Sequence, residues 1–284
     1  MTNGLAIWHY PHRTVTENVR FFAECGFESV SLLGHHMHAL CKDGAMAEEL
    51  AELVSKYRLV LTVHHTLPRT HAAEAIENFR AFVSDVAEWQ RTYGSLSVLS
   101  FDVPEGVRDD AAGYIDLTLS TVPDCKVAVE DFGLTERERR QIEHLKGNRR
   151  FGYLLDMGHL FLRLRGENRD GLTLFTNSPE EHPLTAAPKR ADFLAALGTK
   201  EFPIFEIHLH NNDGKDDLHL FLEDGAMEMA EVAHALRDFG FDGVLTLESA
   251  PGYRFPCPAL ESDLRIQGTF AYWKSLGSHR KEKS

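Results

Sequence analysis

One pattern recurs along the whole chain and restricts the fold more than any other feature. A short apolar run ends in polar residues, and an amphipathic stretch with helical spacing follows it. The apolar runs are GLAIWHY, ESVSLL, RLVLTVHH, LSVLSFD, KVAVEDF, RFGYLLDMGH, PIFEIHLH and DGVLTLES. Nearly continuous apolar strands that alternate with amphipathic helices are typical of a parallel sheet covered by helices.

Eight such units in 284 residues predict an α/β protein with a single (β/α)8 TIM barrel. We expect the barrel over residues 1–276, with an extended loop over about 161–190 and a polar tail over 277–284. A doubly wound sheet is the alternative. However, no glycine-rich phosphate loop follows the first apolar run, as the nucleotide-binding versions of that fold require.

Composition narrows the partners and the compartment. The formal net charge of -13 disfavours broad nucleic-acid binding, because such a surface repels phosphate. No long apolar run is present, so we expect neither a membrane span nor a signal peptide. The cysteines show no CxxC spacing, which predicts free thiols in a reducing compartment and hence a cytoplasmic protein. A homo-oligomer stays open, since no interface pattern is visible.

The ends of the apolar runs carry the residues that suggest chemistry. In barrel enzymes, functional side chains lie at the C-terminal ends of the strands. Four successive runs end in residues of the kind that bind metals: Glu130, Asp156, His208 and Glu248. Each of them alone also has a simpler interpretation, because acids at strand ends often cap helices or lie in solvent.

Side-chain alternation supports convergence of these residues inside the barrel, because residues two apart in a strand share a face. The seventh run has a polar inner face and an apolar outer face: Glu206, His208 and His210 against Phe205, Ile207 and Leu209. Carboxylates that meet in an empty mouth repel one another, and a divalent cation relieves this repulsion. Oxygen-rich ligation with one imidazole suits Mn²⁺ or Zn²⁺, with Co²⁺ or Mg²⁺ as alternatives and no organic cofactor.

The segments VAVED, LLDMGH, EIHLHNNDGKDDLHL and LTLES, in this order, resemble the xylose-isomerase-like barrel superfamily. That superfamily includes endonuclease IV, the ketose 3-epimerases, hydroxypyruvate isomerase and inosose dehydratase. The segment HLHNNDGKDDLHLFLEDG is similar to the family pattern of a histidine on strand seven, then Asp-x-His, then a glycine turn. The resemblance implies that the four residues at the strand ends bind the common metal: Glu130, Asp156, His208 and Glu248.

The resemblance also implies roles for four further positions. In the sugar enzymes, the histidine that matches His159 touches substrate. In endonuclease IV, it joins the residues that match Asp217 and His219 in a further zinc site. The usual histidine of strand three matches His64, with His65 as the less favoured register.

Two departures from the family pattern bear on these roles. Asp102 stands where endonuclease IV has a histidine, which puts a complete three-metal site in doubt. Glu223 stands where a small residue is common, and it places an extra carboxylate either close to the mouth or in solvent.

The leading hypothesis is an isomerase or epimerase of a small sugar, polyol or hydroxy-keto acid. Glu130 and Glu248 would remove and return a proton beside a carbonyl while the metal stabilises the enediolate. Substrate contacts are expected from four residues: His64, His159, His210 and Trp8. Trp8 and its neighbour His9 have packing of the barrel as an equal alternative.

Three other functions stay open. A dehydratase would expel a β-hydroxyl from the same enediolate, with His210 as the acid. A phosphodiesterase that acts on abasic DNA would use a second metal at His159, Asp217 and His219. The third alternative is a barrel that binds sugar without catalysis, which the complete set of four candidate ligands disfavours.

Overall fold

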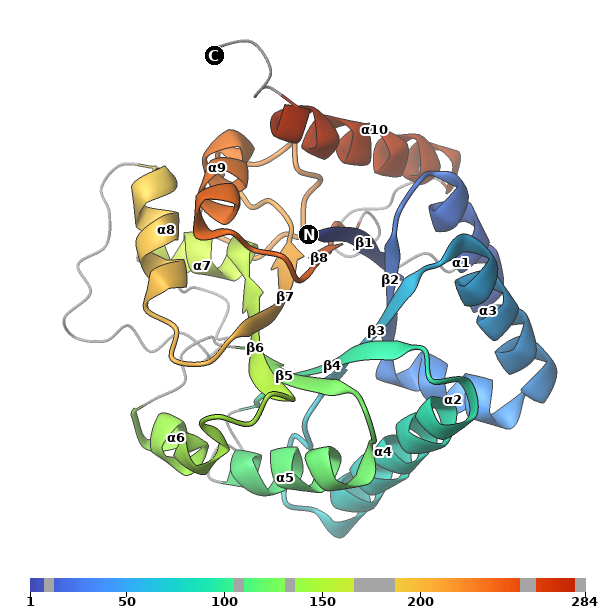
Figure 1. Cartoon of the computed structure of the whole chain (residues 1–284). Coiled ribbons are helices and arrows are strands. Elements are labelled where there is room, and N and C mark those ends of the chain that lie inside the picture. The colour runs from blue at the N-terminus through green and yellow to red at the C-terminus, as the bar shows by residue number, and fades with distance from the viewer. Residues whose placement is uncertain (8–12, 105–109, 131–135, 166–186, 251–258, 279–284) are drawn as a thin grey trace.

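The structure is a computed structural model. It describes residues 1–7, 13–104, 110–130, 136–165, 187–250 and 259–278. Its eight strands are parallel and close into a barrel in sequence order, which confirms the predicted TIM barrel (Figure 1). The strands are β1 (Thr2–Ala6), β2 (Ser29–Leu33), β3 (Val60–Thr66), β4 (Leu96–Asp102), β5 (Lys126–Glu130), β6 (Phe151–Asp156), β7 (Ile204–Leu209) and β8 (Val244–Leu247).

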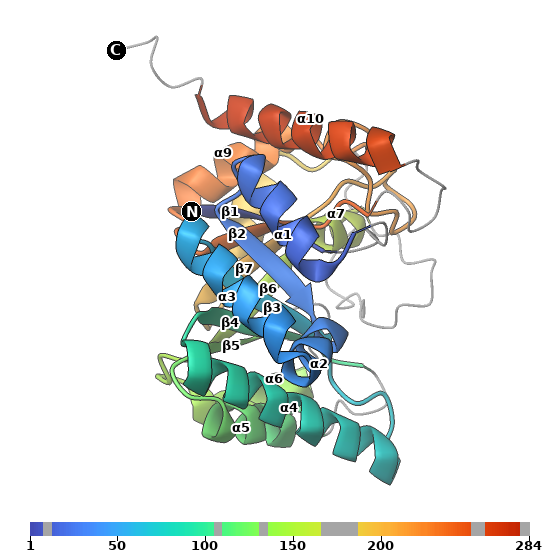
Figure 2. The ribbon, with the colours of Figure 1, turned by 90° about the vertical axis from the view of Figure 1, so that its right-hand side faces the viewer.

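Helices surround this barrel on the outside, and the view from the side shows them stacked along the strands (Figure 2). They are α1 (Val15–Glu24), α2 (Gly34–Lys42), α3 (Gly44–Tyr57), α4 (Ala73–Tyr93), α5 (Ala111–Thr121), α6 (Glu136–Gln141), the 3₁₀ turn η2 (Glu143–Leu145), α7 (Met157–Leu164), α8 (Arg190–Gly198), α9 (Met229–Phe239) and α10 (Ala259–Ser278). None of the described helices is long and apolar enough to cross a membrane.

Local sequence signals set where several helices begin and end. Thr14 caps α1 in a capping box with Glu17, which satisfies backbone N–H groups at the start of the helix. α4 and α9 end at Gly94 and Gly240, which have φ angles of 60° and 76°. Glycine adopts this left-handed conformation without a steric cost, so the chain turns back toward the next strand.

The apolar residues form two clusters. The larger one fills the space between the strands and the helices, and it contains Ile207 and Leu209 of β7. The smaller one fills the lower part of the barrel interior: Val98, Ala128, Leu154, Phe205 and Val244.

The prediction that Phe205 faces outward is therefore wrong. The register of β7 against β6 pairs Tyr153 with Ile204 and Leu154 with Glu206, so Phe205 has no partner between them. Such a bulge inserts one extra residue and re-aims its side chain. Phe205 consequently packs with the inner cluster, while Glu206 and His208 keep their inward places.

Parts of the predicted organisation lie outside the described residues. α7 occupies the start of the loop expected over about 161–190, and α8 begins at Arg190, but residues 166–186 are not described. Trp8 and His9 also lie outside the described residues, as does the tail beyond Ser278.

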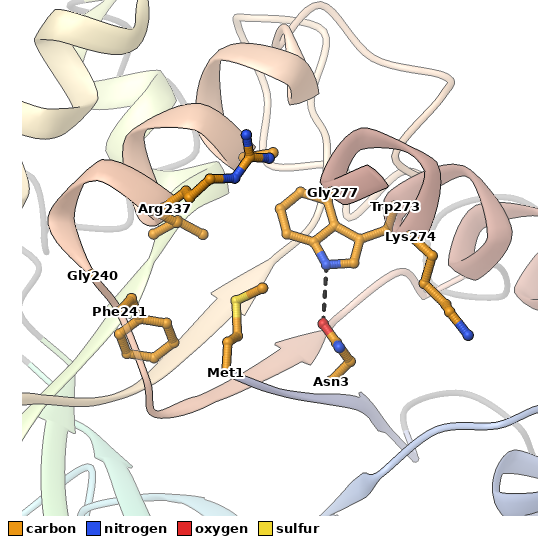
Figure 3. Close-up of a pocket in the computed structure, with 10 residues that line it drawn as sticks. Met1, Asn3, Arg237, Gly240, Phe241, Trp273, Lys274 and Gly277 are labelled. Carbon is orange, nitrogen blue, oxygen red and sulfur yellow. Dashed lines mark hydrogen bonds between the residues drawn. The ribbon is translucent and has the colours of Figure 1, made fainter. Parts of the chain in front are cut away.

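A cavity of about 420 Å³ lies at the N-terminal end of the barrel (Figure 3). Its lining comes from the start of β1, the end of α9 and the end of α10, and includes Met1, Phe241 and Trp273. The indole Nε1 of Trp273 donates to Asn3 Oδ1 at 3.1 Å, which ties α10 to β1. None of the predicted site residues lines this cavity.

Candidate metal centre

The barrel brings the four predicted ligands together at the C-terminal ends of its last four strands. Glu130 ends β5, Asp156 ends β6, His208 lies near the end of β7, and Glu248 directly follows β8. All four side chains are buried. Asp156, His208 and Glu248 offer ligand atoms that lie within 4.8 Å of one another, and so do Glu130, Asp156 and His159.

Asp156 shows how one residue serves the fold and the site together. Its Oδ1 accepts a hydrogen bond from the backbone N–H of His159 at 2.8 Å and thereby caps α7. Its Oδ2 lies 3.1 Å from Nε2 of His210. The simpler interpretation as a helix cap is thus correct for one oxygen, and the other oxygen faces the mouth.

His159 lies between two carboxylates. Its Nδ1 is 2.9 Å from Glu130 Oε1, and its Nε2 is 3.1 Å from Asp217 Oδ2. A neutral imidazole has a single N–H, so it can donate to only one of them. Burial lowers the pKa of His159, but the carboxylates of Asp156 and Asp217 outweigh it and raise this pKa well above its usual value.

His208 also lies between two carboxylates. Its Nδ1 lies 2.9 Å from Glu248 Oε1, and its Nε2 lies 3.6 Å from Glu206 Oε1. Burial alone lowers the pKa of His208, yet the charge of Glu248 helps to raise it well above its usual value. Both imidazoles therefore either carry a proton on each nitrogen or share a carboxylate with a cation.

The two glutamates of the mouth differ in their electrostatic surroundings. Burial and the neighbouring charge of Asp102 raise the pKa of Glu130 well above its usual value. Burial also acts to raise the pKa of Glu248, but the imidazole of His208 outweighs it, so this pKa is lowered.

A second group of donors adjoins the first on one side. Asp217 Oδ2 lies 3.2 Å from His219 Nε2, in addition to its contact with His159. The ring of His210 stacks on that of His219 at 3.8 Å between centroids. His219 Nδ1 lies 3.1 Å from the backbone carbonyl oxygen of Glu248, to which it donates, and this leaves Nε2 to face Asp217.

His219 also has an uncommon backbone conformation, with a φ angle of 49°. A left-handed conformation is unfavourable for a residue with a side chain and persists where the surroundings impose it. The four residues of this second group offer ligand atoms within 4.8 Å of one another: His159, His210, Asp217 and His219.

A third group lies on the side of β3 and β4. His64 Nε2 is 3.2 Å from Asp102 Oδ1, and these two residues form a possible donor set with Glu130. Asp102, noted above as a departure from the pattern of endonuclease IV, thus supplies an oxygen to this group. His65 faces outward, with its ring 4.1 Å from that of Phe82.

Two further glutamates, one buried and one partly exposed, lie near these groups. The sequence placed Glu206 on the inner face but assigned it no role, and the structure puts it directly beneath His208. Glu223 is partly exposed and lies outside the three donor groups, because its Oε2 accepts from Thr269 Oγ1 of α10 at 2.7 Å.

The chemistry of the mouth fits a divalent cation. Each of six carboxylates lies 3.6 Å or less from an imidazole nitrogen: Asp102, Glu130, Asp156, Glu206, Asp217 and Glu248. Among the described residues, three buried polar atoms of the mouth have no hydrogen-bond partner: His210 Nδ1, Asp217 Oδ1 and Glu248 Oε1. Unpartnered buried oxygen and nitrogen atoms at the centre of such a cluster are what a bound cation would satisfy.

Comparison with known proteins agrees with this geometry. The model of the xylose isomerase-like TIM barrel family matches residues 19–266. The chain belongs to this family. The family consists largely of metal-dependent enzymes, and the buried groups of histidine, aspartate and glutamate are consistent with a metal site.

Individual relatives of the xylose isomerase-like family are distant. An uncharacterized protein of Methanocaldococcus jannaschii is 24% identical over 255 residues, which cover 88% of this chain and 84% of the relative. The structure of D-psicose 3-epimerase with D-tagatose from Clostridium cellulolyticum H10 has a TM-score of 0.64 and 11% identity over 97% and 99% of the two chains. A probable 3-DHS dehydratase from Bacillus anthracis has a TM-score of 0.66 and 16% identity over 99% and 100%. At such identities, the structures establish a shared fold only.

Proposed function

We propose that the protein is a divalent-metal-dependent isomerase or epimerase of a small sugar, polyol or hydroxy-keto acid. One observation carries the proposal. Glu130 and Glu248 enter the mouth from β5 and β8, and Asp156 and His208 of the two intervening strands lie between them. Two carboxylates on either side of a bound substrate are the arrangement that proton removal and return require.

The four residues at the strand ends are the proposed metal ligands: Glu130, Asp156, His208 and Glu248. Their three carboxylates and one imidazole favour Mn²⁺ or Zn²⁺, with Co²⁺ or Mg²⁺ as alternatives. When bound there, such a cation would supply a Lewis acid that polarises a carbonyl group and favours the enediolate.

The side chains of the mouth divide the proton transfer between them. Glu248 removes the proton from the carbon beside the carbonyl, and Glu130 gives a proton back from the other side. His159, bonded to Glu130 through Nδ1, holds that carboxyl group in place, and a substrate hydroxyl would take the place of Asp217 at its Nε2. His64 and His210 are proposed as further substrate contacts, and Trp8 stays a prediction from the sequence.

A dehydratase would use the same first step. The enediolate would then expel a hydroxyl group from the β-carbon, and His210 would protonate the leaving oxygen so that water departs. His210 is fully buried and lies 3.1 Å from Asp156. Its place beside the mouth supports this variant as well as isomerisation.

A metal-dependent phosphodiesterase is the second candidate, and a specific observation favours it. The donor group of His159, His210, Asp217 and His219 adjoins the proposed metal centre, and His64, Asp102 and Glu130 form another group beside it. Adjacent cation sites are typical of enzymes that cleave phosphoesters. This candidate predicts more than one metal per chain.

Three measurements on the purified protein separate the candidates. Ketoses, inositol derivatives and hydroxypyruvate are incubated with it in D₂O, and carbon-bound deuterium is followed by NMR. The proposal predicts incorporation that Glu248→Gln abolishes, and about one metal per chain by elemental analysis.

A duplex with an abasic site should stay intact. Nicking that Asp156→Ala abolishes, together with two or three zinc ions per chain, would favour the phosphodiesterase instead.

A further inference from the structure

A buried glutamate beneath the mouth has no part in the proton transfer described above. Glu206 lies on β7 two residues before His208, and its side chain is fully buried at 0% exposure. Burial of a carboxylate is costly, because the charge loses its hydration. The contacts of Glu206 must therefore compensate for this cost.

Hydroxyl groups from three other strands donate to this carboxylate. Thr62 of β3 and Thr246 of β8 donate to Oε1 at 3.0 and 2.8 Å, and Ser100 of β4 donates to Oε2 at 3.0 Å. Hydrogen bonds to an ionised acceptor are stronger than those between neutral groups. Together they hold both oxygens of Glu206 in fixed places below the mouth.

Ser100 connects this carboxylate to His64. A hydroxyl group has one proton, so a Ser100 that donates to Glu206 accepts from its other neighbour. His64 Nδ1 lies 3.1 Å from Ser100 Oγ and is that neighbour. The carbonyl oxygen of Val63, which competes with Glu206 for the proton of Ser100, is farther away at 3.5 Å. The proton of His64 is then on Nδ1, and its lone pair is on Nε2, which faces Asp102 Oδ1 at 3.2 Å.

The charge of Glu206 acts on the imidazole of His208 directly, without a residue between them. Its Nε2 lies 3.6 Å from Glu206 Oε1, and no described residue bonds to this nitrogen. The distance is too long for a hydrogen bond, but the buried charge still favours a proton on Nε2, and a cation bound by Glu248 would leave Nδ1 of His208 without a proton. The Nδ1 lone pair of His208 then points to the mouth, where Glu248 Oε1 lies 2.9 Å away.

We propose that Glu206 is a positioning residue that sets the tautomers of His64 and His208, so that each ring presents a lone pair to the mouth. The inference rests on the metal centre of the proposed function and deepens it. Carboxylates behind metal-binding imidazoles commonly fix the ring and its tautomer. Here one carboxylate serves two rings, one through space and one through a serine hydroxyl.

The test compares two variants with the wild-type chain. Glu206→Gln keeps the shape and removes the charge, and Thr62→Val removes one hydroxyl donor and keeps the charge. In Glu206→Gln we expect Zn²⁺ affinity, measured by competition with a chromophoric chelator, to fall roughly 10–100-fold. Thr62→Val should bind Zn²⁺ nearly as tightly as the wild type. In the metal-free proteins, ¹H–¹⁵N spectra of the imidazoles should show that His64 loses its Nδ1–H form only in Glu206→Gln.

The outcomes separate this inference from the proposed function. A folded Glu206→Gln with wild-type Zn²⁺ affinity and unchanged tautomers overturns the role of Glu206. If this variant does not fold, Ser100→Ala decides instead, because it disconnects His64 from Glu206 and leaves the charge of Glu206 in place. His64 must then change its tautomer in the metal-free protein, and no change in His64 overturns the inference. A wild-type chain that binds no Zn²⁺ contradicts the proposed metal centre, whereas the tautomer of His64 in the metal-free protein still tests Glu206.

Discussion

The two ends of the barrel differ in the side chains that line them: one end is polar and the other is mainly apolar. At the C-terminal end, buried histidines and carboxylates contact one another, and several of their polar atoms have no hydrogen-bond partner among the described residues. At the N-terminal end, a cavity is lined mainly by apolar side chains, and the buried indole of Trp273 has a hydrogen-bond partner in Asn3. A barrel needs its apolar end for stability, and it can carry an unsatisfied polar end only if a ligand satisfies it.

The two ends should therefore respond differently to substitution. Changes at the mouth should alter metal binding and activity with little loss of stability. Changes at the N-terminal end should reduce stability and leave the metal content unchanged.

The largest effect is expected for Asp156→Asn. Asparagine caps a helix as well as aspartate does, so α7 should persist. However, the site loses the charge of a residue that offers a ligand atom both beside His208 and Glu248 and beside Glu130 and His159. We expect the tightly bound metal to disappear and proton exchange to fall roughly 10²–10³-fold. Elemental analysis and deuterium incorporation measure the two effects.

Asp43→Asn is the matched control, because Asp43 caps α3 through the same kind of bond, from Met46 N–H at 3.1 Å. This variant should keep its metal. Loss of metal from both variants would mean that a general loss of folding, and not the mouth, explains the result.

The next largest effect is expected at the opposite end. Trp273→Ala removes a buried indole, only 4% exposed, and should lower the free energy of unfolding by about 3 kcal/mol. Trp273→Phe keeps most of the apolar contact and loses mainly the hydrogen bond to Asn3. It should therefore lower the free energy of unfolding by only about 1 kcal/mol. Urea unfolding measures both values. A loss of metal in the folded Trp273→Phe protein would break the separation of the two ends.

Metal removal tests whether the ends are independent. A metal at a hundred times its dissociation constant stabilises the folded state by about 2.7 kcal/mol, and chelation should remove this contribution. The effects of distant sites on stability usually add, so chelation should lower the free energy of unfolding of the wild type and of Trp273→Phe by the same amount. Thermal unfolding with and without chelator measures it, and a different shift in the variant would show that the two ends are coupled.

The smallest effect is expected for Glu223→Gln. Glu223 bonds to Thr269 of α10 and lies outside the donor groups, so its charge should not influence the metal. We expect the free energy of unfolding to change by less than about 1 kcal/mol and the metal content to stay the same. Weaker metal binding in this variant would place Glu223 in the mouth after all.

The sequence predicted the barrel and the convergence of the candidate ligands, because the apolar runs and their polar ends are local patterns. Alternation along β7 was enough to place His208 and His210 inside. The same rule failed for Phe205, since a bulge depends on how β7 pairs with β6. The bonds of Glu206 to hydroxyls of β3, β4 and β8 depend on the register of distant strands, so the sequence alone could not reveal them.

A crystal of the protein soaked with Zn²⁺ or Mn²⁺ tests the central claim most directly, through the anomalous signal of the metal. We expect a peak at the mouth, in contact with Asp156, His208 and Glu248. Further peaks beside Asp217 and His219 would shift the account toward phosphoester chemistry. A well-ordered mouth without an anomalous peak, at metal concentrations that occupy other sites, would contradict the claim that these residues form a metal centre.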